Sequence, residues 1–146
     1  MEKNESFEPD RIQYLQMIQD MISRMSTSSA LFKGFSATIV AGISMISYCQ
    51  QNIVVILLSF VPVAVFAILD IYYLRLERKM RYLYGLVREG NHICDFNMEF
   101  EVEKAKYKNA GMRGIDLIKS PSIYIFYPAM IMILIIVLGM KIGGII

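Results

Sequence analysis

The sequence predicts an all-α membrane protein with three transmembrane helices, an amphipathic N-terminal helix and a small cytoplasmic segment that contains one short strand. Its 146 residues are 55% hydrophobic and only 19% charged, with a mean hydropathy of +0.46. Soluble domains carry about a quarter charged residues. A bilayer crossing needs about 20 apolar residues, and three stretches of the chain meet that length. These observations exclude an ordinary soluble domain.

The three apolar stretches lie at residues 30–49, 53–74 and 120–140. The first is the least apolar because it contains Lys33 and several hydroxyl side chains, and the third contains no charge. We expect four parts in the chain: a cytoplasmic amphipathic helix at 1–29, a transmembrane hairpin at 30–74, a cytoplasmic basic segment at 75–119 and a third transmembrane helix at 120–146.

The positive charges predict the orientation. Ten of the fifteen Lys and Arg residues fall within 75–119, whereas the connection at 49–52 has none. Because Lys and Arg concentrate in cytoplasmic loops, we expect a multi-pass protein of the bacterial inner membrane with its N-terminus inside and its C-terminus outside. Basic residues that follow the second span are expected to face anionic headgroups, with nucleic acid as the minor alternative: Arg75, Arg78, Lys79 and Arg81.

The first helix carries an apolar stripe at alternating three- and four-residue spacing. It begins at Leu15, Ile18, Ile22 and Met25 and continues in register to Ile46. This pattern predicts one long helix over residues 10–48, or two nearly collinear helices with a bend at 26–29. Asp10 and Gln13 have the form of a capping box at its start. The stripe fits packing on the chain's own second helix and packing between subunits equally well.

A second feature of the first helix is a ridge of small residues at four-residue spacing. Small side chains allow the backbones of two membrane helices to approach closely. The pattern does not say whether the partner helix belongs to the same chain. We call this set the small-residue ridge, and it consists of Ser26, Ala30, Gly34, Thr38 and Gly42.

The second helix is expected to continue beyond the membrane. Leu76, Met80, Leu83 and Val87 recur at helical spacing, and Gly90 is placed to end the helix. Residues 96–103 then alternate strictly between apolar and polar side chains, which is the period of a strand. The alternative for this segment is the frayed start of a helix.

Asp70 is the leading candidate for a functional residue, because an ionisable group within a span is costly. Lys33 lies eighteen residues before the turn near Gln51, and Asp70 lies nineteen after it. At 1.5 Å per residue, both fall about 27–29 Å along their helices. We therefore predict an intramembrane charge pair. A salt bridge that fixes the hairpin is the plainer interpretation, and a role in gating or ion passage is the sharper one.

Sites for catalysis, cofactors or metals are not indicated. The chain has one histidine, His92, and two cysteines, Cys49 and Cys94, which the predicted topology places on opposite sides of the membrane. No zinc-type spacing, nucleophile–base set or phosphate-binding glycine loop is present. We expect a protein that is not an enzyme and that needs neither cofactor nor metal.

Three short sequences, at residues 18–25, 29–34 and 68–74, resemble a family of small bacterial multi-span membrane proteins. The likeness covers roughly residues 10–100, and its most specific part is Asp70-Ile-Tyr-Tyr73 at the end of the second span. The family has no established activity. Proteins of this build are often encoded beside anti-phage defence genes, which by analogy implies a membrane effector that responds to a sensor.

Two functions remain open on these grounds. The first is an oligomeric pore-forming or membrane-perturbing effector in anti-phage defence, which has the bilayer and copies of itself as partners. The alternative is an anchor or scaffold that recruits a cytosolic sensor or regulatory protein through residues 75–119. No direct contact with nucleic acid is expected.

Overall fold

The computed structural model describes residues 7–49, 53–89 and 111–144, and within these ranges all regular structure is helical. Three segments are long and apolar enough to cross a membrane, Pro9–Ile46, Ile53–Arg88 and Pro121–Ile142, in agreement with the three predicted spans. The possible strand at 96–103 and Gly90 lie outside the described residues. The helices are α1 Phe7–Cys49, α2 Ile53–Leu58, α3 Phe60–Arg88, α4 Gly114–Ile118, α5 Pro121–Tyr124 and α6 Phe126–Ile142.

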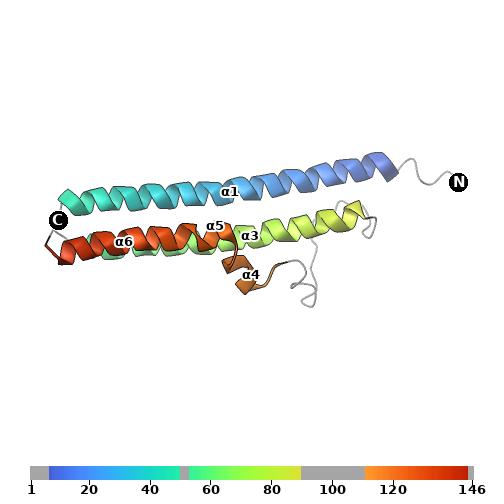
Figure 1. Cartoon of the computed structure of the whole chain (residues 1–146). Coiled ribbons are helices and arrows are strands. Elements are labelled where there is room, and N and C mark those ends of the chain that lie inside the picture. The colour runs from blue at the N-terminus through green and yellow to red at the C-terminus, as the bar shows by residue number, and fades with distance from the viewer. Residues whose placement is uncertain (1–6, 50–52, 90–110, 145–146) are drawn as a thin grey trace.

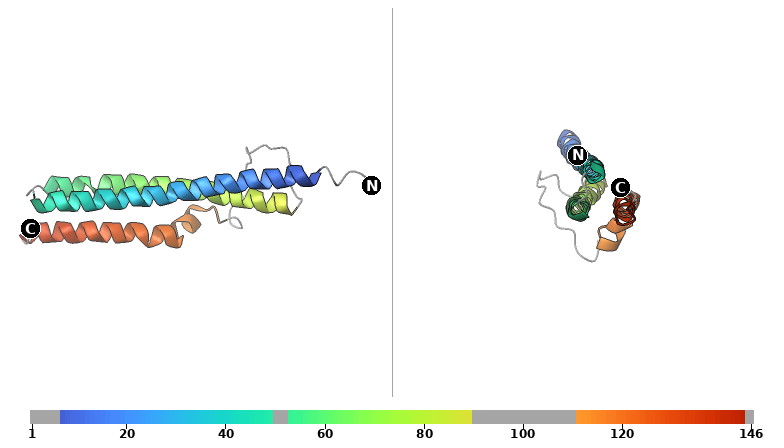
Figure 2. Two further views of the ribbon diagram at one scale, coloured as in Figure 1. Left: turned by 90° about the horizontal axis from the view of Figure 1, so that it is seen from above. Right: turned by 90° about the vertical axis from the view of Figure 1, so that its left-hand side faces the viewer.

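The helices divide the molecule into two parts along its length. α1 and α3 lie side by side in opposite directions over nearly their whole length, whereas α5 and α6 accompany them over one half only (Figures 1 and 2). The 43 residues of α1 make a helix about 65 Å long, about twice the hydrocarbon thickness of a bilayer. We call residues 7–28 and 75–89 the two-helix arm, and the remaining helices, apart from α4, the three-helix part.

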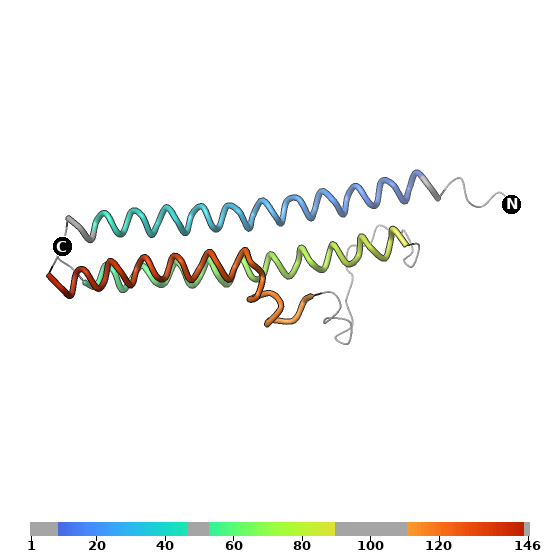
Figure 3. The backbone as a smooth tube through the Cα atoms, viewed as in Figure 1, coloured from blue at the N-terminus to red at the C-terminus, as the bar shows by residue number. Residues whose placement is uncertain are grey.

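α1 is continuous from Phe7 to Cys49 (Figure 3), so the structure has the single long helix and not two collinear helices. Two hydroxyls in this stretch bond to the carbonyl four residues earlier, Thr27 to Ser23 O and Ser28 to Arg24 O, both at 3.0 Å. The capping box predicted at Asp10 and Gln13 is wrong, because α1 begins at Phe7, three residues before Asp10.

Two prolines coincide with interruptions of the spans. Proline has no N–H to donate to the carbonyl four residues earlier, and its ring clashes with that carbonyl. The helical segments are interrupted at Ser59, three residues before Pro62, and again at Ile125, three residues before Pro128. At the first break the Ser59 N–H bonds to Ile56 O at 3.2 Å instead. The two breaks therefore have the same cause.

Two separate apolar cores hold the helices together. The arm core joins α1 to α3, and its buried members are Tyr14, Ile18, Met80, Leu83 and Val87. The membrane core joins α1, α3, α5 and α6, and its buried members are Val40, Val63, Ile123, Tyr127 and Leu134.

The predicted apolar stripe of α1 supplies the arm core on its side. Ile18 is fully buried, and Leu15, Ile22 and Met25 pack against the same cluster. Of the two alternatives left open by the pattern, the structure therefore supports packing on the chain's own second helix.

Candidate functional site: a polar network between the two cores

Three polar side chains connect α1 to α3 at the level where the arm meets the three-helix part. The ammonium nitrogen of Lys33 lies 2.6 Å from Oδ2 of Asp70. It also donates a hydrogen bond of 2.8 Å to the Ser29 hydroxyl oxygen, and that hydroxyl donates to Oδ1 of Asp70. The structure therefore brings Lys33 and Asp70 together, as their equal distance from the turn predicts, and adds Ser29 as a third member.

The two charged side chains differ in how far they are exposed. The Asp70 side chain is 1% exposed and that of Lys33 is 18% exposed. Among the described residues, Oδ2 of Asp70 accepts no hydrogen bond of standard geometry, so its charge is balanced by the nearby ammonium group. Removing a buried carboxylate from water is costly unless a counter-charge and hydrogen bonds replace the lost solvation. Lys33 and Ser29 together provide that replacement.

The third span reaches the same network through Tyr127. This side chain is 4% exposed, and its hydroxyl donates a hydrogen bond of 3.1 Å to the carbonyl of Phe66 on α3. It also lies within electrostatic reach of Asp70. Tyr127 thus ties α6 to α3 one helical turn from the charge pair, and one polar network holds all three spans.

Aromatic rings surround the charge pair. Phe32 packs edge-on against Tyr73 with ring centroids 5.2 Å apart and lies 6.2 Å from Phe66. Tyr72 on α3 and Tyr124 on α5 are exposed. Tyrosine is enriched at both membrane–water interfaces, where its ring meets lipid and its hydroxyl meets water. This arrangement indicates that the network lies near one membrane boundary.

The small-residue ridge lies on a surface of α1 that the described helices leave exposed. All five of its residues are exposed, and a Cβ atom added at Gly34 or Gly42 would meet no atom within 4 Å. The Thr38 hydroxyl bonds to its own helix at Gly34 O. The two glycines therefore make no close approach to another helix of the described chain.

The four basic residues predicted to face headgroups have different surroundings. Arg78 bonds to the carbonyls of Gly111 and Asp116, the latter at 3.2 Å, and so holds the segment before the third span against α3. Arg81 forms an exposed pair with Glu77 at 2.7 Å. Arg75 is exposed and Lys79 is half-buried.

The arm carries a groove of about 570 Å³ between α1 and α3, whose lining includes Ile22, Ser26, Arg81 and Tyr84. A groove of about 220 Å³ also lies along this helix pair. Within residues 7–49, 53–89 and 111–144, no three His, Cys, Asp or Glu side chains are grouped to hold a metal ion.

Comparison with protein-family models, with curated proteins and with solved structures finds no match to the chain. Function therefore has to be inferred from the geometry of the helices and from the chemistry of the polar network.

Proposed function

We propose that the protein is a non-enzymatic, homo-oligomeric protein of the bacterial inner membrane that acts as a pore-forming or membrane-perturbing effector in anti-phage defence. The observation that carries the proposal is the exposed small-residue ridge within the first span. Lipid tails are as apolar as leucine, so membrane helices associate through close packing over small residues. The ridge offers such a surface to a second copy.

Assembly matters for an effector because the membrane core of one chain is filled with side chains. Val40, Val63 and Leu134 are 3%, 2% and 0% exposed, and they close the space between the three spans. A path for ions or a defect in the bilayer would therefore form between copies. Phe35 and Leu31, more than half exposed beside the ridge, supply apolar contacts for that interface. The defence role itself rests on the resemblance at residues 18–25, 29–34 and 68–74.

The test replaces Gly34 and Gly42 by leucine. A Cβ atom at either position meets no atom of the described chain within 4 Å, and both glycines are exposed, so we expect the helices of the monomer to keep their packing. Across a close helix pair, the added side chains push the backbones apart. We expect the double variant to lose its oligomeric state in native mass spectrometry and its toxicity in cells together. Leucine favours membrane insertion, so a loss of toxicity would not reflect failed targeting.

Gly139→Leu is the matched control, because Gly139 is a glycine of α6 that also has open space around its Cβ position. We expect it to retain assembly and toxicity. A monomeric parent protein would refute the proposed assembly. An oligomer that leaves the membrane potential unchanged when triggered would refute the effector role.

A second candidate is an anchor or scaffold that recruits a cytosolic sensor or regulatory protein. The two-helix arm favours it, because 22 residues of α1 extend about 30 Å beyond the three-helix part, where residues 75–89 help to line the groove. The same measurement of membrane potential separates the two functions.

A further inference from the structure

Helix α4 lies at the junction between the arm and the three-helix part (Figure 1). Its inner side packs into the protein, because Leu117 and neighbouring Met112 are 2% and 3% exposed. Ile115 and Ile118 are 66% and 54% exposed. Residues three apart lie on the same side of a helix, so these two isoleucines form one apolar face turned away from Leu117.

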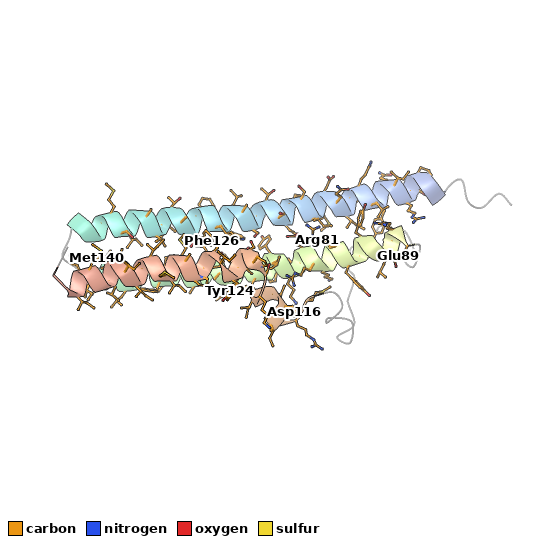
Figure 4. All side chains as sticks on the ribbon, viewed as in Figure 1. Arg81, Glu89, Asp116, Tyr124, Phe126 and Met140 are labelled. Carbon is orange, nitrogen blue, oxygen red and sulfur yellow. The ribbon has the colours of Figure 1, made fainter. Side chains whose placement is uncertain are left out.

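The position of α4 next to a span decides which medium this face meets. Only Lys119 and Ser120 separate α4 from Pro121, where the third candidate span begins. Two residues extend at most about 7 Å, so α4 stays at the membrane surface whenever α5 and α6 cross the bilayer. α4 contacts α5, and Figure 4 labels Asp116 on α4 and Tyr124 on α5 at the start of this span. The isoleucine face therefore lies at the level where the third candidate span begins.

The charges around α4 fit the same location. Arg113 and Lys119, at either end of α4, are both exposed. Basic residues beside an apolar helix face are typical of segments that lie in the headgroup region, where they attract anionic lipids.

Contacts within the protein hold α4 in place. Arg78 bonds to the carbonyl oxygens of Gly111 and Asp116. Gly111 has a φ of +63°, a conformation that favours glycine. A Cβ atom at this position would lie 3.1 Å from the Arg78 guanidinium, a tight contact that would shift the arginine slightly. The apolar face is thus presented before any lipid binds.

We propose that α4 is an interfacial helix that inserts Ile115 and Ile118 into the boundary between headgroups and acyl chains, with Arg113 and Lys119 on anionic headgroups. The leaflet is the one from which the arm extends. This inference does not depend on whether the protein is an effector or a scaffold, because it concerns how the third span is seated in the membrane.

The chain contains no tryptophan, so a single introduced tryptophan is a unique fluorescent reporter. We would place it at Ile118 and reconstitute the full chain into vesicles of phosphatidylcholine and phosphatidylglycerol with bromine at defined acyl positions. Two matched positions bracket the result: Ile12, 52% exposed on the arm, and Ile135, 56% exposed in α6. We expect Ile118→Trp to be quenched most by shallow bromine, Ile135→Trp by deep bromine and Ile12→Trp by neither.

Tryptophan itself prefers interfaces, so a second reporter is needed. Ile118→Cys, in a background without the native cysteines, should react at least several-fold more slowly with a water-soluble maleimide than Ile12→Cys does. Replacing Arg113 and Lys119 by glutamine should remove the dependence of quenching on phosphatidylglycerol.

Each contrary outcome overturns a defined part of the proposal. Water-like emission and fast maleimide labelling at position 118 would place α4 in water. Blue-shifted emission without bromine quenching would mean that protein covers the isoleucines. Quenching that is indifferent to phosphatidylglycerol in the parent would refute the role of the two basic residues.

Discussion

The unequal burial of Lys33 and Asp70 leads to a prediction about which half of the pair the protein can lose. Lys33→Met leaves the Asp70 carboxylate, 1% exposed, without its cation. Asp70→Leu leaves Lys33, 18% exposed, on a long flexible stem near a membrane boundary. A lysine in that position can turn its ammonium group toward the headgroups, whereas the short aspartate side chain has no such route.

The magnitudes follow from this difference. Removing one partner of a buried ion pair lowers the free energy of unfolding by roughly 3–5 kcal/mol when the other charge stays buried. We expect a loss of this size for Lys33→Met. Asp70→Leu should lower the free energy of unfolding by only about 1 kcal/mol, as the loss of one hydrogen bond does, because the remaining ammonium regains solvation. The double variant should lie close to the parent, since replacing a whole buried pair by apolar residues is often neutral. Contacts between polar groups of membrane helices average about 0.6 kcal/mol, so the pair itself adds little.

The assay is reversible unfolding in mixed micelles, followed by circular dichroism, for the parent, both single variants and the double variant. We expect the order of stability to be parent, double variant and Asp70→Leu close together, with Lys33→Met clearly lowest. The charge-swapped protein, with Asp at position 33 and Lys at 70, should recover part of the loss. If Asp70→Leu is the less stable single variant, or if both behave like the parent, this account of the network is refuted.

Three further predictions concern topology, the α4 contact and the arm. In a background without native cysteines, a cysteine at Asn52 should react with an impermeant label in intact cells and one at Lys104 should not; labelling at 104 would contradict the topology. Arg78→Gln should speed hydrogen exchange of the α4 amides about tenfold or more, because hydrogen bonds from a charged donor contribute about 1.5–3 kcal/mol. Arg81→Gln, which breaks only an exposed pair, should leave exchange there unchanged. Leu83→Ala, at a fully buried position, should destabilise the arm by about 2–5 kcal/mol and speed its proteolysis; an unchanged rate would show that the arm core is not required.

The spans and the charge pair could be predicted from the sequence because both depend on distance along a helix. Every residue adds the same rise, so counting from the turn near Gln51 was enough to place Lys33 beside Asp70. Composition alone predicted the three spans. Neither inference required knowledge of which side of a helix faces a neighbour.

The remaining members of the network could not be found in that way. Ser29 and Tyr127 are common residue types, and their roles depend on the rotation of α1 and α6 about their own axes. α6 is apolar on every side, so no pattern indicates which face meets α3. Ser29 did have one available signal, its position one helical turn before Lys33 on the stripe that faces α3. The partner of that stripe was equally undetermined, because packing within a chain and packing between copies produce the same spacing.

The location of the polar network limits how the arm and the spans can influence each other. α1 and α3 run without a break past Lys33 and Asp70, so a shift of one helix against the other in the arm cannot reach the spans without straining this pair. α6 ends short of the arm core, and among the described residues it meets the network through Tyr127. A partner that binds the arm would therefore act on the third span through these side chains or through the Arg78 contact to α4, and on the small-residue ridge through the continuous α1. On this argument, Asp70→Leu should leave insertion intact and weaken the effect of any arm ligand on the third span.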